Sequence, residues 1–119
     1  MEPLTIDALF DAAIQIQLIE EKSLTITFSG SIVSIKFPTT RRLADFLIVP
    51  HYYMLPYFGM MEKEGLITRV ERVGIMTTTK GSRKFILRMM EYSRGDAEQV
   101  LGAAVCADLV TRVVNVPDV

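Results

Sequence analysis

The chain has 119 residues, of which half are apolar and 23% are charged, and its formal net charge is −1. This length and composition fit one globular domain with a buried core, and they exclude a disordered tail and a uniformly basic polyanion binder. No apolar run approaches the roughly 20 residues of a membrane-spanning helix, and the N-terminus lacks the pattern of a signal peptide, so we expect a cytoplasmic protein. The single cysteine, Cys106, lies among alanine and valine and is expected to be buried.

Residues 6–20 are predicted to form the first helix. Asp7 and Asp11 lie one turn apart on a narrow polar stripe, and the apolar remainder of the helix, which includes Leu9 and Phe10, is wide. A helix with so broad an apolar surface is expected to bury against two partners at once.

Residues 24–37 alternate between apolar and polar side chains, and the pair Ser29-Gly30 in the middle is suited to a tight turn. This pattern predicts a β-hairpin. Pro38 then ends the second strand.

The next helix is predicted to begin after Thr39 or Thr40, because either hydroxyl can cap a helix start. Leu43, Phe46 and Leu47 follow at helical spacing and share one face of this helix.

A second central helix is expected to follow Pro50, which suits a first helical turn. Met54, Phe58 and Met61 form its apolar stripe, and Gly65 can end it in the left-handed conformation.

Pro56 conflicts with a continuous helix from Pro50, because a proline inside a helix deletes a hydrogen bond and clashes one turn back, at a cost of about 3 kcal/mol. Either the helix is kinked at Pro56, or residues 50–55 form a separate turn and Pro56 is the first helical residue.

Residues 66–72 alternate between apolar and polar or charged side chains, and the chain can turn at Val73-Gly74 and return through residues 75–77. This pattern predicts a two-stranded ribbon. Thr78 is placed to cap the helix that follows.

Residues 96–114 are predicted to form one long helix, with Gly95 ending the previous helix, Asp96 as the cap and Pro117 as the end. Its apolar side chains point in almost every direction, so we expect burial on more than one side. The second side is predicted to be another subunit of a homodimer, and the alternative is the core of the chain itself. The predicted interface residues are Leu9, Phe10, Val100, Leu101, Ala104, Val105, Leu109 and Val113.

Four stretches carry a resemblance to a known family: Thr39-Thr40-Arg41-Arg42-Leu43-Ala44, Val49, Met61-Glu62-Lys63-Glu64-Gly65-Leu66-Ile67 and Thr78-Thr79-Lys80-Gly81. In this order they resemble the winged helix-turn-helix domain of bacterial and archaeal transcription regulators. The resemblance implies an α+β fold with a winged helix-turn-helix core at 39–92, an added N-terminal helix and β-hairpin at 5–37, and a C-terminal dimerisation helix at 96–114, all within one domain, 1–119. It also implies double-stranded DNA binding and transcription regulation.

Positive charge is concentrated late in the chain. Residues 69–94 contain seven basic and two acidic side chains, a net charge of +5. A local patch of this kind attracts a polyanion, and the alternative is a solvated helix face.

In the winged-helix pattern the second central helix enters the major groove of DNA. The predicted DNA-contact residues are Arg41, Arg42, His51, Tyr52, Tyr53, Tyr57, Arg69, Arg72, Lys80, Arg83 and Lys84. Residues 49–59 contain no Arg, Lys, Asn, Gln or acid, which are the side chains that usually read base edges. Their aromatic side chains could instead form a protein-contact surface, or pack beneath the N-terminal hairpin.

Catalysis is not expected, because the sequence has no glycine-rich phosphate loop and no nucleophile with a histidine at a recognisable spacing. One histidine and one cysteine cannot build a zinc site of the usual kind. No metal and no cofactor is predicted.

Overall fold

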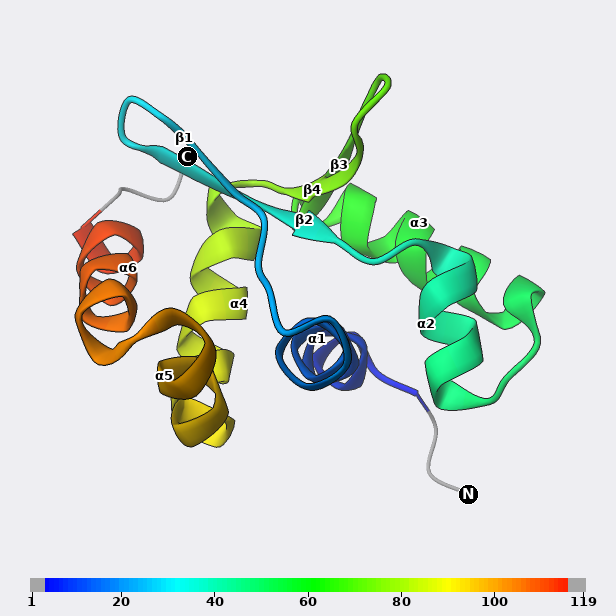
Figure 1. Ribbon diagram of the computed structural model, residues 1–119. Coiled ribbons are helices and arrows are strands. Elements are labelled where there is room, and N and C mark those ends of the chain that lie inside the picture. The colour runs from blue at the N-terminus through cyan, green and yellow to red at the C-terminus, as the bar shows by residue number, and fades with distance from the viewer. Residues whose placement is uncertain (1–3, 116–119) are drawn as a thin grey trace.

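Four antiparallel strands form a sheet in the order β1-β2-β4-β3, which runs along the upper side of the molecule in the view of Figure 1. The structure, a computed structural model, describes residues 4–115. The strands are β1 (Ile26–Ser29), β2 (Ile32–Phe37), β3 (Ile67–Val70) and β4 (Gly74–Thr77). Both predicted hairpins are therefore present, and the pairing of β2 with β4 joins them into one sheet.

The helices lie mostly on one side of this sheet (Figure 1), and together with it they confirm the predicted α+β class. They are α1 (Ile6–Gln15), the π-helix η1 (Ile16–Glu21) that continues it, α2 (Thr40–Leu47), the 3-10 turn η2 (His51–Tyr53), α3 (Met54–Lys63), α4 (Thr79–Tyr92), α5 (Arg94–Leu101) and α6 (Ala103–Asn115). None of the helices in the described part of the chain is long and apolar enough to cross a membrane.

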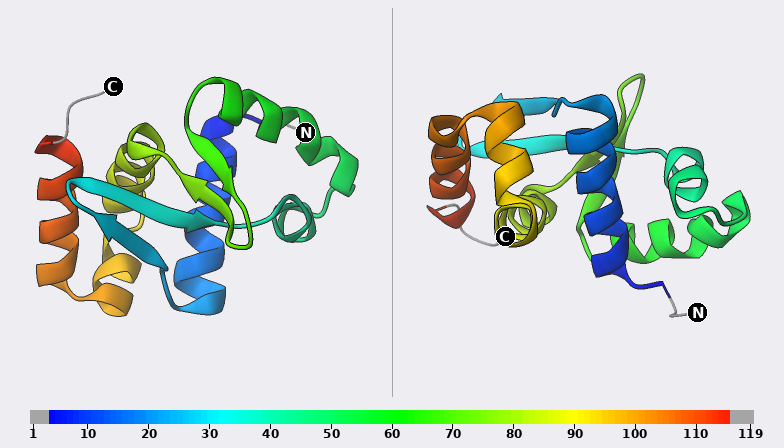
Figure 2. Two further views of the ribbon diagram at one scale, coloured as in Figure 1. Left: turned by 90° about the horizontal axis from the view of Figure 1, so that it is seen from above. Right: turned by 60° about the horizontal axis from the view of Figure 1, so that its bottom comes forward.

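Helix α1 occupies the centre of the molecule. In every view it lies between the α2–α3 pair and the group formed by α4, α5 and α6 (Figure 2). Phe10 of α1 contacts Phe37 of β2 and Phe85 of α4, with ring centroids 5.2 and 6.5 Å apart, and Phe37 reaches Phe58 of α3 at 6.0 Å. These four rings join both halves of the molecule into one core.

Four of the predicted interface residues lie within this core. Leu9 and Phe10 are fully buried, and Leu109 and Val113 are 1% and 3% exposed. They are not available to a second subunit, so their assignment to a dimer interface is wrong. The apolar surface of α1 is covered by α2, α4 and the sheet, while the buried stripe of α6 packs on α4.

The predicted single C-terminal helix is also wrong. Helix α5 ends at Leu101, and Gly102 adopts φ 91° and ψ 147° before α6 begins. Only glycine takes this conformation easily, so the break occurs there and lets α6 fold back onto α4 (Figure 1). Helix α4 ends at Tyr92 and Ser93 follows it, so Gly95 lies inside α5 and does not end the preceding helix. Pro117 lies outside the described residues.

The local signals in the middle of the chain are confirmed. Thr39 Oγ1 accepts a hydrogen bond from the Arg42 N–H at 3.1 Å, and Thr78 Oγ1 accepts one from the Gly81 N–H at 3.1 Å. Gly65 has φ +74°, the left-handed conformation expected at the end of α3.

The conflict at Pro56 is resolved by a separate turn. The turn is shorter than predicted: Pro50 precedes the 3-10 turn η2 and α3 begins at Met54, so Pro56 is the third residue of the helix and not its first. A residue in the first helical turn has no N–H acceptor within the helix, so proline is tolerated there.

Candidate functional site

The outward face of α3 is apolar as far as Met60, and its last turn carries the exposed Glu62 and Lys63. Met54, Phe58 and Met61 are fully buried, as their spacing predicts. On the opposite side of the same turn and helix, Tyr52 and Leu55 are 64% and 49% exposed, and other outward positions include Pro56, Gly59 and Met60. The helix therefore presents to solvent a stripe that has few hydrogen-bonding groups.

The turn between α2 and α3 extends this apolar surface. Ile48, which ends α2, is 90% exposed and adopts φ 57° and ψ 51°. The left-handed conformation costs an L-residue about 1–2 kcal/mol, and a β-branched side chain is among the least suited to it. The chain thus holds a large apolar side chain in solvent on a strained backbone, and such strain is often found at functional sites.

The four predicted groove residues of this region do not behave alike. Tyr52 and Tyr53 project into solvent, and their rings pack edge to face with centroids 4.9 Å apart. His51 is half-buried, and its Nε2 lies 2.7 Å from Oγ1 of Thr40. Tyr57 packs against the core. Of these four residues, only Tyr52 and Tyr53 are free to meet a partner.

The basic run at 69–94 is partly neutralised within the chain. Asp11 of α1 forms a two-pronged ion pair with Arg88 of α4, at 2.7 and 2.8 Å. Asp7, one turn earlier, accepts a hydrogen bond from the Lys84 ammonium. The polar stripe of α1 therefore faces the cationic side of α4, and the run is not an open basic patch.

Other cations of this run and its surroundings are also engaged. Arg69 pairs with Glu62 at 3.1 Å, and the Lys80 ammonium donates to the Glu64 carbonyl at 3.1 Å. Arg83 donates to the Val113 carbonyl at 3.1 Å. The Arg69–Glu62 pair reduces the positive charge available to a polyanion, whereas the carbonyl contacts orient Lys80 and Arg83 and leave their charge in place.

Two predicted contact residues keep open guanidinium groups. Arg41 lies exposed in the first turn of α2, and Arg72 lies exposed in the turn of the β3–β4 ribbon, with φ 67°. Neither forms an ion pair with another residue of the 4–115 range. Arg42, by contrast, is bound to Glu20, and that hydrogen bond raises the pKa of its guanidinium.

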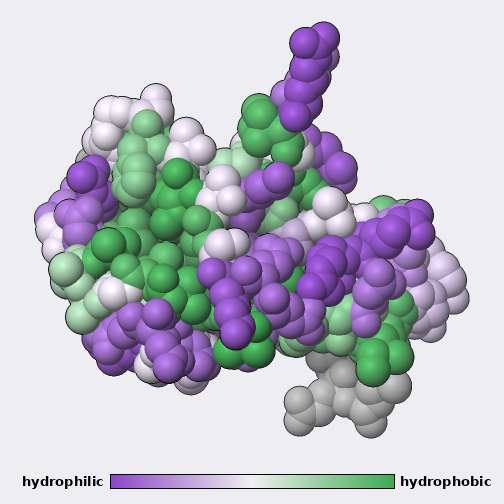
Figure 3. Space-filling model, in the orientation of Figure 1, coloured by the Kyte–Doolittle hydropathy of each residue, from purple (hydrophilic) through white to green (hydrophobic). Residues whose placement is uncertain are grey.

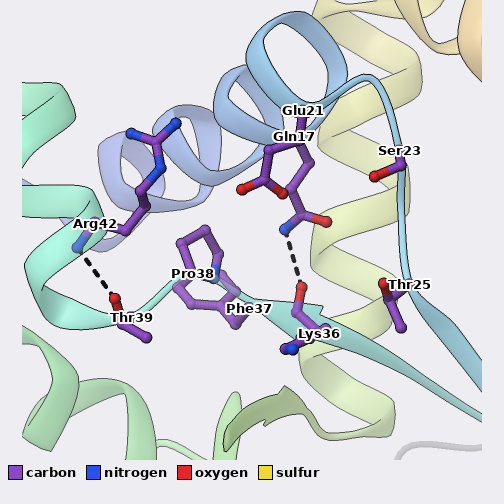
Figure 4. A pocket seen from close by; sticks show the side chains of 9 residues that line it. All are labelled: Gln17, Glu21, Ser23, Thr25, Lys36, Phe37, Pro38, Thr39 and Arg42. Carbon is purple, nitrogen blue, oxygen red and sulfur yellow. Dashed lines mark hydrogen bonds between the residues drawn. The ribbon is translucent and has the colours of Figure 1, made fainter.

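A polar pocket adjoins the start of α2 (Figure 4). It has a volume of about 330 Å³ and is lined by Gln17, Glu21, Ser23, Thr25, Lys36, Phe37, Pro38, Thr39 and Arg42. Gln17 is 4% exposed, and its amide nitrogen donates to the Lys36 carbonyl at 2.9 Å. Sequence reasoning missed this pocket, because its walls come from η1, the loop after it, β2 and the first turn of α2.

A second apolar surface lies at the far end of the molecule from α3. Figure 3 shows a broad hydrophobic area on the side where α5, α6 and β1 lie. Phe28 and Val105 are 50% and 47% exposed, and the Arg112 guanidinium lies over the Phe28 ring at 4.9 Å. Of the predicted interface residues, Ala104 and Val105 are exposed, and Val100 and Leu101 are half-buried.

Among residues 4–115 no group of three or more metal-binding side chains is found. Comparisons of the chain with protein-family models, with curated proteins and with solved structures gave no match.

Proposed function

We propose that the chain is a winged helix-turn-helix protein that binds double-stranded DNA through α3 and the β3–β4 ribbon. The order α1, β2, α2, α3, β3, β4 and the pairing of β2 with β4 and of β4 with β3 support this proposal, because a short strand between the first two helices and a two-stranded ribbon after the third are features of that domain. In such a domain the second helix of the turn enters the major groove, and the ribbon contacts the flanking backbone. The observation that carries the proposal is that the outward side of α3 is left uncovered by the rest of the chain.

Phosphate contacts would come from Arg41 and Arg72. Arg41 is adjacent to Thr40, which is bonded to His51 at the start of η2, so it lies near the exposed tyrosines. Lys63, exposed at the end of α3, is a third candidate. With about three phosphate contacts, the logarithm of the affinity would fall with the logarithm of salt concentration with a slope of roughly −3.

The proposed regulator acts as a homodimer, through the surface of α5, α6 and β1. Large exposed apolar areas on single chains often mark interaction sites. Val105→Asp would place a charge in this interface and convert the dimer to a monomer in size-exclusion chromatography with light scattering. Val73→Asp, at an equally exposed valine of the ribbon, is the matched control. A monomeric wild-type chain would contradict this part of the proposal.

A protein-interaction module is the second candidate function. The apolar stripe of α3 and the exposed pair Tyr52 and Tyr53 favour it, because tyrosine is enriched in the cores of protein interfaces. In this case α3 would bind another protein, and DNA affinity would be absent even at low salt.

Fluorescence anisotropy of a labelled duplex, measured at several salt concentrations, tests the DNA-binding proposal. The double variant Arg41→Glu with Arg72→Glu is expected to lose binding, because two phosphate contacts become repulsive. The control is Lys22→Glu with Arg94→Glu, which changes the net charge by the same amount at positions outside α2, α3 and the ribbon. Equal loss in both variants, or no binding by the wild type, would overturn the proposal.

A further inference from the structure

We propose that α3 recognises thymine-rich duplex DNA by packing its apolar stripe against the C5-methyl groups of thymine in the major groove. This inference rests on the proposed function and specifies the ligand of the same surface. Tyr52, Leu55 and Met60 are the large side chains of the stripe, and they are 64%, 49% and 48% exposed.

The chemistry of the stripe selects this ligand. Sequence reading by hydrogen bonds needs side chains with paired donors or acceptors, and residues 49–59 have none of the usual ones. The thymine methyl is the apolar group that a base pair presents in the major groove, and apolar side chains contact it directly. An apolar helix face therefore complements thymine, and among the three large side chains of the stripe only Tyr52 carries a hydrogen-bonding group.

The shape of the helix permits a close approach. Gly59 lies on the outward side of α3, and a Cβ added to it would meet nothing within 4 Å, so the space in front of the backbone is open. A site without a side chain allows the helix to sit deep in a groove. From Tyr52 to Met60 the chain rises about 12 Å, which matches roughly three to four base steps of 3.4 Å.

The charges around the stripe favour DNA over an apolar protein partner. Arg41 lies near the beginning of the stripe and Arg72 stands on the neighbouring ribbon, and neither forms an ion pair within residues 4–115. Lys63 lies beyond the other end of the stripe, between Glu62 and Glu64. The two unpaired guanidinium groups match a groove whose floor carries methyl groups and whose rims carry phosphates.

Removing the methyl group from the DNA tests the inference directly. The probes are two labelled duplexes of alternating sequence, one of adenine and thymine and the other of adenine and uracil, which lacks only the C5-methyl. Each buried methyl is expected to change the Kd about fourfold, equivalent to about 0.8 kcal/mol. Contact with two methyls would make the thymine duplex bind more than tenfold tighter.

A matched pair of variants assigns the effect to α3. Leu55→Ala is expected to reduce the thymine-to-uracil affinity ratio by about fourfold, the equivalent of one methyl contact. Leu87→Ala removes a leucine of α4 that is 40% exposed, and it should leave the ratio unchanged. A ratio that falls equally in both variants would overturn the assignment to α3.

Adding a methyl group provides the reciprocal test. A duplex of alternating inosine and cytosine is compared with the same duplex carrying 5-methylcytosine, and the methylated form should bind more tightly. An equal Kd with and without the methyl group in both comparisons would overturn the inference and leave the proposed DNA binding intact. Absence of binding to every duplex would overturn both, and the apolar stripe would then be assigned to a protein partner.

Discussion

His51 is joined to Thr40 by a hydrogen bond of 2.7 Å between Nε2 and Oγ1. Thr40 is the first residue of α2 and His51 begins the 3-10 turn that precedes α3, so the bond connects the start of one helix to the approach to the next. The relative placement of the two helices therefore depends on a polar contact as well as on their shared apolar core.

Removing this contact is expected to destabilise the fold modestly. A double-mutant cycle of His51→Ala and Thr40→Val should give a coupling free energy of about 0.5–1.5 kcal/mol in urea unfolding, the usual range for a hydrogen bond. Thr111→Val is the control for the threonine change, because Thr111 Oγ1 donates only to the Ala107 carbonyl of its own helix. Additive effects in the cycle would show that the contact contributes nothing to stability.

Replacing Ile48 by glycine is expected to stabilise the fold. The left-handed conformation at φ 57° is strained for isoleucine and accessible to glycine, and a side chain that is 90% exposed loses little burial. The free energy of unfolding should rise by about 1 kcal/mol, measured by chemical denaturation. Ile19→Gly, which truncates an exposed isoleucine within the right-handed helix η1, should instead lower it.

Replacing either of two helical glycines by alanine is expected to change the free energy of unfolding, in opposite directions at the two sites. Gly59→Ala should raise the free energy of unfolding by roughly 0.5–1 kcal/mol, because the site is open and alanine favours the helix. Gly81→Ala should lower it by about 1–3 kcal/mol or more, since the new Cβ would lie 1.8 Å from the Leu66 carbonyl oxygen. Thermal unfolding of both variants beside the wild type checks this, and the same sign for both would contradict the close approach of α4 to the Leu66 backbone.

Stability is expected to decline in acid partly through Asp7. The hydrogen bond from Lys84 lowers the pKa of the Asp7 carboxyl below its ordinary value of 3.8. The unfolded chain therefore binds the proton more readily, so the contribution of Asp7 is complete above pH 3.8 and is lost as the pH falls through the lower, folded-state pKa.

Asp7→Asn should accordingly reduce stability at neutral pH by up to about 1 kcal/mol, and the difference from the wild type should shrink below pH 3.8. Urea unfolding across this range measures it. Asp45→Asn, at an exposed carboxylate that forms no ion pair within residues 4–115, is the control. A deficit in Asp7→Asn that persists in strong acid would show that packing and not charge is responsible.

The elements that the sequence predicts well are those with local causes. The hydroxyls of Thr39 and Thr78 and the left-handed Gly65 act within a few residues, and each lies where its pattern indicates. Most of the chain's strands and helices follow from such signals. The exposed tyrosines of η2 could also be placed from the spacing of Met54, Phe58 and Met61.

The features that sequence reasoning missed depend on distant contacts or on ambiguous residues. A glycine in an apolar helical pattern is compatible with a continuous helix, so the break at Gly102 had no unique signal. The ion pair of Asp11 with Arg88 joins positions 77 residues apart, so the composition of 69–94 alone overstated its free charge. Burial of Leu9 and Phe10 on all sides likewise depends on the placement of α1 at the centre.

The ion pairs between α1 and α4 would have a kinetic consequence for the proposed binding of DNA. A protein surface with little net positive potential receives little electrostatic acceleration of its encounters, so association with a DNA site would proceed at the roughly 10⁵–10⁷ M⁻¹s⁻¹ of orientation-limited docking. Because the protein would make few phosphate contacts, its complexes with non-specific duplex would also be short-lived. Because the cations of α4 pair with the carboxylates of α1, the protein would slide little along DNA. It would find its site mainly by diffusion through solution.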